Sequence, residues 1–160
     1  MSTKAQAIKE NSSSVLASLG VGSIIYLTQG NFYATVVTIL DGESAVAMNT
    51  LGEGANTTFV ITMYEFNGSN EAKISLQENA TGASKAYWVP GNSTSGLTNP
   101  ILLGSEPGQF LLTDTGDGVI SIQNTFSPPS PYIQNGVANI LSYGFDQPST
   151  QGFFNIGIAG

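Results

Sequence analysis

The sequence predicts an all-β fold made of three similar units, and three observations support this prediction. Short apolar stretches rich in Val, Ile, Phe, Tyr and Thr alternate with Gly, Asn and Pro along most of the chain. Only 9% of the 160 residues are charged, whereas exposed helices usually carry rows of Glu and Lys. A Phe-led apolar stretch also recurs three times, and an Ile-x-Leu or Ile-x-Ile strand precedes the copies by 34, 36 and 33 residues. The copies begin at Phe59, Phe110 and Phe153, and the preceding strands begin at Ile25, Ile74 and Ile120.

Residues 1–22 form a predicted N-terminal arm before the strand-rich part of the chain. Ser12-Ser13-Ser14 can cap one helical turn that runs to Leu19 and ends at the glycines that follow. A loose arm lying over the domain is the alternative. The first residues contain no apolar segment typical of a secretory signal, so we expect a cytoplasmic protein or one exported by a non-classical route.

Residues 23–160 are expected to form a single domain of twelve short strands, four in each unit. The units span approximately residues 23–69, 70–116 and 117–160. The first unit has predicted strands at 24–29, 32–40, 44–50 and 57–66, and the second at 71–78, 84–89, 100–104 and 108–114. The predicted strands of the third unit are 118–124, 131–134, 137–144 and 151–158.

Two further positions repeat between the Ile strand and the Phe strand of each unit. A constant strand order with variable loops is expected when a repeated unit buries its apolar face against its own copies. If the aromatic residue of the second strand is its core position, strict alternation makes the neighbouring Trp88 face outward. The aromatic residues are Tyr33, Tyr87 and Tyr132, and the apolar third strands lie around Val46, Ile101 and Ile140.

A three-fold repeat of four strands that closes to remove sheet edges resembles the β-trefoil fold. Ricin-B-like trefoil lectins, of a type found in fungi, carry a Gln-x-Trp motif on the fourth strand of each unit. Gln151-Gly152-Phe153 resembles that motif with Phe in place of Trp, whereas Gln109-Phe110 lacks the spacer and Thr57-Thr58-Phe59 has Thr at the Gln position. The resemblance covers residues 23–160. A β-sandwich or jelly roll is the alternative architecture, although it does not explain the three-fold spacing.

The residue types that the chain lacks narrow its function. It has no Arg, His or Cys, only four Lys residues, and a formal net charge of −7. Binding to nucleic acid is therefore disfavoured, because Lys and Arg supply most contacts to phosphate. The usual general base, thiol nucleophile and zinc ligands are missing as well. We expect a protein that is not an enzyme and that holds no metal or other cofactor.

Candidate ligand-binding residues occur in the first two units. Trp88 lies at a strand-to-loop transition shortly before Asn92. An exposed ring there would carry the apolar face of a sugar, and the amide would bind its hydroxyl groups. The resemblance to ricin-like sites also implicates Asn56, three residues before Phe59, and Asp41 in a loop of the first unit. Ordinary packing in the core is the alternative for Trp88, and ordinary turn chemistry is the alternative explanation for Asn56 and Asp41.

The third unit offers a second group of candidates. Tyr132 and Asn135 lie near one predicted strand, and Asp146 follows the next one. An aromatic ring with amide and carboxylate groups is typical of sites for neutral sugars. Asp114 and Asp117 are instead expected in a turn between units, because the sequence around them lacks the ligand ladder of an EF-hand calcium loop.

These observations favour a non-catalytic carbohydrate-binding protein, a lectin for neutral galactose-, GalNAc- or mannose-type glycans. The first alternative is a trefoil protease inhibitor or other protein-binding module that inserts the loops 78–84, 90–99 and 124–131 into a target. The second is a structural protein that forms homo-oligomers through its low-charge surface. The longest apolar run is far shorter than the ~20 residues that cross a membrane, so no membrane span is expected.

Overall fold

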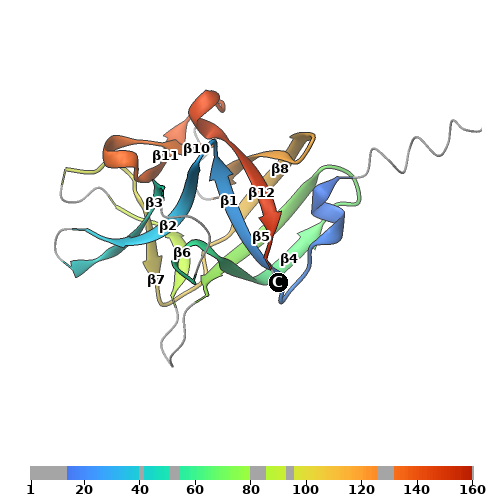
Figure 1. Cartoon of the computed structure of the whole chain (residues 1–160), viewed down its shortest axis with the longest axis horizontal. Helices are drawn as coiled ribbons and strands as arrows, with labels where there is room; N and C mark the ends of the chain where they lie inside the picture. Colours follow the sequence, from blue (N-terminus) through green and yellow to red (C-terminus); the bar gives the residue numbers. More distant parts are fainter. Residues whose placement is uncertain are drawn as a thin grey trace, which may run out of the picture.

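The computed structural model describes residues 14–39, 42–50, 55–79, 86–92, 96–125 and 132–159, and the chain is all-β within these ranges (Figure 1). The predicted all-β class is therefore confirmed. No helix in the described ranges is long and apolar enough to cross a membrane. The helical elements are short 3-10 turns: η1 (Val15–Ser18), η3 (Ala55–Thr57), η4 (Val137–Asn139) and η5 (Thr150–Gly152).

Six strands pair with one another in a closed ring. All six pairings are antiparallel, and the last strand of the ring pairs with the first. Each of the six strands therefore has a partner on both sides. Closing a sheet in this way removes the unpaired edges through which sheets aggregate. In ring order they are β1 (Ile24–Gln29), β4 (Phe59–Phe66), β5 (Glu71–Glu78), β8 (Phe110–Gly116), β9 (Val119–Asn124) and β12 (Phe153–Ile158).

The other six strands form three hairpins. Each hairpin continues the sheet from one ring strand, since β2 pairs with β1, β6 with β5 and β10 with β9. Figure 1 shows the hairpins gathered toward one end of the molecule and η1 toward the other. All twelve strands overlap ranges predicted from the sequence. The hairpins are β2 (Phe32–Thr38) with β3 (Ser44–Asn49), β6 (Tyr87–Pro90) with β7 (Ile101–Gly104), and β10 (Tyr132–Asn135) with β11 (Leu141–Phe145).

The core of the ring repeats with the same three-fold pattern. In each unit the Ile of the first strand is fully buried and lies directly opposite a fully buried Phe of the fourth strand. In the third unit this ring belongs to Phe154. The sequence pattern matched Phe153 to Phe59 and Phe110, and this match is wrong by one residue. Phe153 lies on the other face of β12 and is only half-buried. The three pairs are Ile25–Phe59, Ile74–Phe110 and Ile120–Phe154.

Trp88 belongs to the core, so the prediction that it faces outward is wrong. Its side chain is fully buried and packs edge-on against Phe59 and Phe110, with ring centroids 5.2 and 6.0 Å away. Ala34 and Ile133, which follow the tyrosines of β2 and β10, are fully buried as well. The core position of each second strand is therefore the residue after the tyrosine.

A smaller apolar cluster joins the three hairpins. Ala45 of β3 lies opposite Leu102 of β7, and Ala47 of β3 forms an isolated bridge with Ile140, just before β11. Ile140 packs in this cluster, whereas the neighbouring Leu141 packs in the main core. The predicted third-strand core position is thus also displaced by one residue in the third unit.

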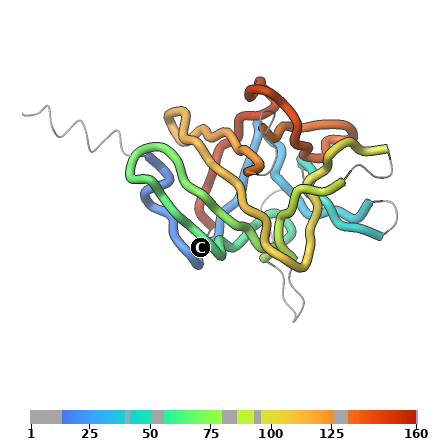
Figure 2. Tube along the Cα trace, turned by 180° about the vertical axis from the view of Figure 1, so that it is seen from behind, coloured from blue at the N-terminus to red at the C-terminus, as the bar shows by residue number. Residues whose placement is uncertain are grey.

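The described part of the N-terminal segment packs onto the main core. Ser14 caps η1 by accepting a hydrogen bond of 3.0 Å from the Leu16 N–H, in agreement with the predicted helical turn. Leu16 is fully buried, and its carbonyl accepts a hydrogen bond of 2.5 Å from the Tyr64 hydroxyl. Figure 2 shows η1 beside the hairpin of β4 and β5. This segment contributes a core side chain rather than lying loosely over the domain.

Candidate functional site

The predicted ligand-binding residues of the first two units lie in different parts of the structure. Asn56 is exposed in η3, and Asn92 is exposed just after β6. Trp88 is enclosed by the core and presents no ring to a ligand. Asp41 lies outside the described residues. Of the proposed pair of Trp88 and Asn92, only Asn92 is available to a ligand.

The candidates of the third unit all belong to the hairpin of β10 and β11 or follow it directly, but they lie at different ends of it. Tyr132 is directly opposite Phe145, so it lies close to the exposed Asp146 that follows β11. Asn135 lies at the other end of β10, opposite Leu141, and its Oδ1 is buried without a hydrogen-bond partner among the described residues. Asp146 thus follows the residue that pairs with Tyr132, at the opposite end of β10 from Asn135.

The loops that would serve a protease inhibitor lie largely outside the described residues. Residues 80–84, 93–95 and 126–131 fall within the predicted insertion loops and are not described. The inhibitor alternative therefore rests on segments of which the structure describes only the ends.

A set of residues that the sequence interpretation missed surrounds the repeated tyrosines. Each tyrosine is half-buried and is the first or second residue of its hairpin. On one side it lies opposite a polar residue of the preceding ring strand. On the other side it lies opposite a residue of the partner strand in the same hairpin. Residues directly opposite one another in antiparallel strands lie on the same face of the sheet. We call these sets tyrosine rows. Row 1 is Thr28, Tyr33 and Asn49; row 2 is Gln77, Tyr87 and Gly104; row 3 is Gln123, Tyr132 and Phe145.

A second tyrosine, Tyr26, lies beside row 1. The rings of Tyr26 and Tyr33 are in tilted contact, with centroids 5.6 Å apart. The Tyr26 ring lies over Gly157 of β12, where an added Cβ would come within 2.3 Å of the ring. The absence of a side chain at Gly157 therefore lets this ring lie flat against the sheet.

Row 2 differs from the other rows because its third position is Gly104. This residue is part of the lining of a cavity of about 480 Å³, which we call the Gly104 hollow. The hollow has an apolar wall, backbone from two glycines, one carboxylate and one amide. Neutral ligands with an apolar face and several hydroxyl groups are bound by such combinations. The lining residues are Glu43, Val89, Pro90, Gly91, Asn92, Leu102, Leu103 and Gly104.

Contacts between the second and third hairpins fix the position of the chain beside Asn92. The Tyr143 hydroxyl of β11 donates a hydrogen bond of 2.8 Å to the Gly91 carbonyl. The Gly91 N–H donates to the Pro100 carbonyl at 2.8 Å. A Cβ at Gly91 would lie 2.5 Å from the Leu102 side chain, so the close approach requires glycine. Asn92 therefore leaves the hairpin from a backbone position that is held on both sides.

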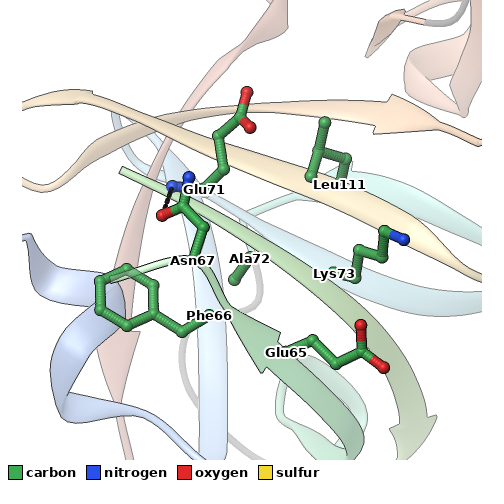
Figure 3. A pocket seen from close by; sticks show the side chains of 7 residues that line it. All are labelled: Glu65, Phe66, Asn67, Glu71, Ala72, Lys73 and Leu111. Atoms are coloured by element: carbon green, nitrogen blue, oxygen red, sulfur yellow. Dashed lines mark hydrogen bonds between the residues drawn. The ribbon is translucent and has the colours of Figure 1, made fainter. Parts of the chain in front are cut away.

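A second cavity of about 230 Å³, which we call the Lys73 hollow, lies on β4, β5 and β8 (Figure 3). Figure 3 shows the side chains of Glu65 and Lys73 extending to one side and the Phe66 ring extending to the other. The strand register agrees, because Glu65 lies opposite Lys73 whereas Phe66 lies opposite the buried Ala72. The Phe66 ring is partly buried and packs against the core, although it also forms part of the lining of this hollow. The Lys73 hollow thus combines charged side chains with one partly buried aromatic ring.

Two residues that hold the N-terminal segment, Tyr64 and Asp114, have shifted pKa values. Burial raises the pKa of Tyr64 to about 12. Partial burial also acts to raise the pKa of Asp114, but hydrogen bonds from the Ser14 hydroxyl and from the N–H groups of Gly116 and Val15 outweigh it, so this pKa lies below its usual value. Among the described residues no three carboxylates are grouped so that they could hold a metal ion.

The fold is similar to that of solved structures. One is a structural-genomics structure of a Caenorhabditis elegans protein with unknown function, with a TM-score of 0.61 and 11% identity over 87% of this chain and 95% of that one. Another is the SDF2-like protein from Arabidopsis thaliana, with a TM-score of 0.60 and 12% identity over 86% and 93% of the two chains. No protein-family model matches the sequence, and no curated protein matches it. At these identities the likeness concerns the fold alone.

Proposed function

We propose that the chain is a β-trefoil that binds neutral carbohydrate without catalysing a reaction. The trefoil architecture is supported by the pairing of the strands. Two strands of each unit enter the six-stranded ring, and the other two form a hairpin at one end of it. The three buried Ile–Phe pairs sit at matching places in this arrangement, as three copies of one unit would require.

The three tyrosine rows carry the functional proposal. Tyrosine offers an apolar ring and a hydroxyl group, and a directly opposite Thr or Gln adds a hydrogen-bonding group on the same face. The core residue after each tyrosine would maintain the fold without it, so packing alone does not account for an aromatic residue at this half-buried position in all three units. A ligand-binding role at repeated sites does account for it.

The Gly104 hollow is the proposed main site, because only there among the described rows does the third position lack a side chain. Gly104 belongs to both row 2 and the lining of the hollow, whereas Tyr87 lies opposite Gly104 and is not itself part of the lining. Val89, Pro90 and Leu102 would cover the apolar face of a sugar ring. The Asn92 amide would donate and accept hydrogen bonds, and the Glu43 carboxylate would accept from two hydroxyl groups. A monosaccharide or the end of a glycan matches this combination of groups.

Neutral glycans of the galactose, GalNAc or mannose type are the proposed ligands. The chain has a formal net charge of −7, and the described lining of the Gly104 hollow contains a carboxylate and no cation. Acidic sugars such as sialic acid would be repelled at long range and left without a partner at the site. The absence of His and Cys from the sequence, together with a single carboxylate among the described lining residues, supports the non-catalytic part of the proposal.

A glycan array followed by calorimetry with site variants tests this function. The wild-type protein is expected to bind at least one neutral glycan. Asn92→Ala and Glu43→Gln should each weaken that binding by about tenfold, the effect of losing one hydrogen bond or one charge-assisted bond. Asn56→Ala is the matched control, because Asn56 is also an exposed asparagine but lies in η3. Binding to no neutral glycan, or equal loss in all three variants, would contradict the proposal.

A further inference from the structure

The chain contains two Asn-Gly dipeptides, Asn67-Gly68 and Asn135-Gly136, and the structure places them in opposite environments. In this dipeptide the glycine nitrogen lies within reach of the asparagine side-chain carbon, and no glycine side chain shields it. Both residues of the first pair are exposed in the turn between β4 and β5, whereas both residues of the second are partly buried.

Three backbone donors converge on the side-chain oxygen of Asn67. Its Oδ1 accepts hydrogen bonds from the N–H groups of Ser69, Asn70 and Glu71 at 2.8, 3.1 and 3.1 Å, the last of which is drawn in Figure 3. These donors also fix which side-chain atom is the oxygen. They are arranged as in an oxyanion hole, so they would stabilise an oxygen that gains negative charge.

The attacking nitrogen is free at the first pair. The Gly68 N–H donates no hydrogen bond within the described residues, and the space where a Gly68 side chain would lie is empty within 4 Å. The φ angle of Gly68 is +85°, a conformation that favours glycine. Within the described residues the Gly68 nitrogen is thus not engaged elsewhere, while the Asn67 side-chain oxygen is held by three donors.

Both features are reversed at the second pair. The Gly136 N–H is engaged in a hydrogen bond of 2.9 Å with the Ile140 carbonyl. A Cβ at Gly136 would lie 2.8 Å from the Ser142 Oγ, so the chain is closely packed there. The Asn135 Oδ1 is buried without any donor among the described residues, and an oxygen that gains charge in such a place is destabilised.

We propose that Asn67 is a site of spontaneous deamidation in the folded protein and that the fold protects Asn135. The Gly68 nitrogen forms a bond to Cγ of Asn67 and loses its proton to solvent, and the oxygen of the tetrahedral intermediate is held by the three donors. The bond from Cγ to Nδ2 then breaks, and ammonia leaves with a proton from solvent. Water opens the resulting five-membered imide to aspartate or isoaspartate, so the overall reaction consumes one water and releases one ammonia.

The reaction changes the charge of the Lys73 hollow. Asn67 lines this hollow together with Glu65, Glu71 and Lys73. The new carboxylate adds one negative charge to the formal net charge of −7. The three backbone donors would hold an aspartate carboxylate more strongly than the neutral amide, because charge-assisted hydrogen bonds are stronger. Isoaspartate lengthens the main chain in this turn and would disrupt the same three bonds.

Peptide mapping by mass spectrometry tests the proposal on the full wild-type chain. The folded protein is kept in mildly alkaline buffer, and aspartate plus isoaspartate are measured at both positions over time. Residue 67 is expected to react about tenfold faster than residue 135. A parallel sample in denaturant supplies the control, because both dipeptides lose their structural differences when the chain unfolds and their rates should become similar.

Ion-exchange chromatography gives an independent readout. Asn67→Asp marks the elution position of the product, and Asn67→Ser should not form the new acidic species, whereas Asn135→Ser should form it at the wild-type rate. Residue 67 reacting no faster than residue 135 in the folded protein would overturn the proposal. So would a slower reaction at residue 67 in the folded than in the denatured chain. Neither outcome depends on carbohydrate binding.

Discussion

The Ser14 hydroxyl donates a hydrogen bond of 2.6 Å to Oδ2 of Asp114, although the two residues are separated by 100 positions in the sequence. The Val15 N–H donates to the same oxygen at 3.1 Å, and the Gly116 N–H donates to Oδ1 at 2.8 Å. Asp114 thus connects the start of η1 to β8. The carboxylate holds the N-terminal segment where Leu16 enters the core.

Acid should loosen this connection. The pKa of Asp114 is lowered in the folded protein, so its contribution to stability is present above the unfolded-state value near 3.9 and is lost as the pH falls through the folded-state value. Asp114→Asn should abolish this part of the acid dependence, because the amide does not titrate there. Urea unfolding of both proteins at neutral and at acid pH measures it. An unchanged acid dependence in the variant would contradict the assigned role.

Alkali should act on the same segment through Tyr64. The pKa of Tyr64 is raised to about 12, so the stability that its neutral hydroxyl provides is complete below the usual value near 10 and is lost as the pH rises toward 12. Spectrophotometric titration of the folded protein should show a tyrosine that ionises near pH 12, and Tyr64→Phe should remove that step. A titration curve that Tyr64→Phe leaves unchanged in this range would refute the burial of this hydroxyl.

Leu16 should behave as a core residue despite its place near the start of the described chain. Leu16→Ala is expected to lower the free energy of unfolding by about 2–5 kcal/mol, because the side chain is fully buried and leaves a cavity. Val21→Ala is the control, since that side chain is 69% exposed and its removal should change stability by less than about 0.5 kcal/mol. Chemical denaturation of both variants measures the difference.

Trp88 should report on the core and not on a ligand. As the only Trp, fully buried beside Phe59 and Phe110, it should fluoresce at short wavelength and resist quenching by acrylamide. Trp88→Ala should cost about 3–5 kcal/mol. Trp88→Phe should cost less, because the Trp88 Nε1 has no hydrogen-bond partner among the described residues and its loss removes an unpaired buried donor. If sugar changes the Trp88 fluorescence without changing the stability of the protein, the ring is not enclosed in the core as described.

Gly108 should tolerate substitution less well than Gly20. A Cβ at Gly108 would lie 2.6 Å from the Trp88 carbonyl oxygen, which is backbone and cannot rotate away. Gly108→Ala is expected to destabilise the protein by about 1–3 kcal/mol. Gly20 has no atom within 4 Å of such a Cβ, so Gly20→Ala should be nearly neutral. Thermal unfolding of the two variants side by side gives the comparison.

The spacing of apolar residues predicted where the strands lie, but not always which face each residue takes. Ile74 lies between Lys73 and Ser75, and these polar neighbours leave one clear core position. Phe153-Phe154 and Ile140-Leu141 each offer two adjacent apolar residues, so either phase of the alternation satisfies the pattern. The two members of each pair are equal or similar in size, so side-chain size does not show which of them faces the core. Long-range packing against the other units selects the phase, and that information is not local.

The same ambiguity concealed the tyrosine rows. Tyr87-Trp88 again presents two adjacent large side chains, and placing the tyrosine in the core forced the tryptophan outward. A signal for the correct phase was present in the sequence. A polar residue follows the buried Ile by three positions in every unit, and the structure places each one opposite a tyrosine. These polar residues are Thr28, Gln77 and Gln123.

The Gly104 hollow could not be predicted from sequence spacing. Glu43 precedes β3, while Asn92 follows β6, and these segments meet only because the hairpins of the first two units converge. Asn92 was found because its amide stood next to a strand end. Glu43 and Gly104 had no such local signal, since one is an isolated carboxylate and the other an ordinary strand-end glycine.

A titration of isotope-labelled protein with neutral galactose-, GalNAc- and mannose-type glycans, followed by amide NMR spectra, tests the carbohydrate proposal most directly. With at least one of these glycans, the amide signals of Glu43, Asn92 and Gly104 should shift in a saturable way, while those of Asn56 and Lys73 should stay in place. Saturable shifts confined to the Lys73 hollow, or no shift with any of these glycans, would contradict the assignment of the Gly104 hollow as a carbohydrate site.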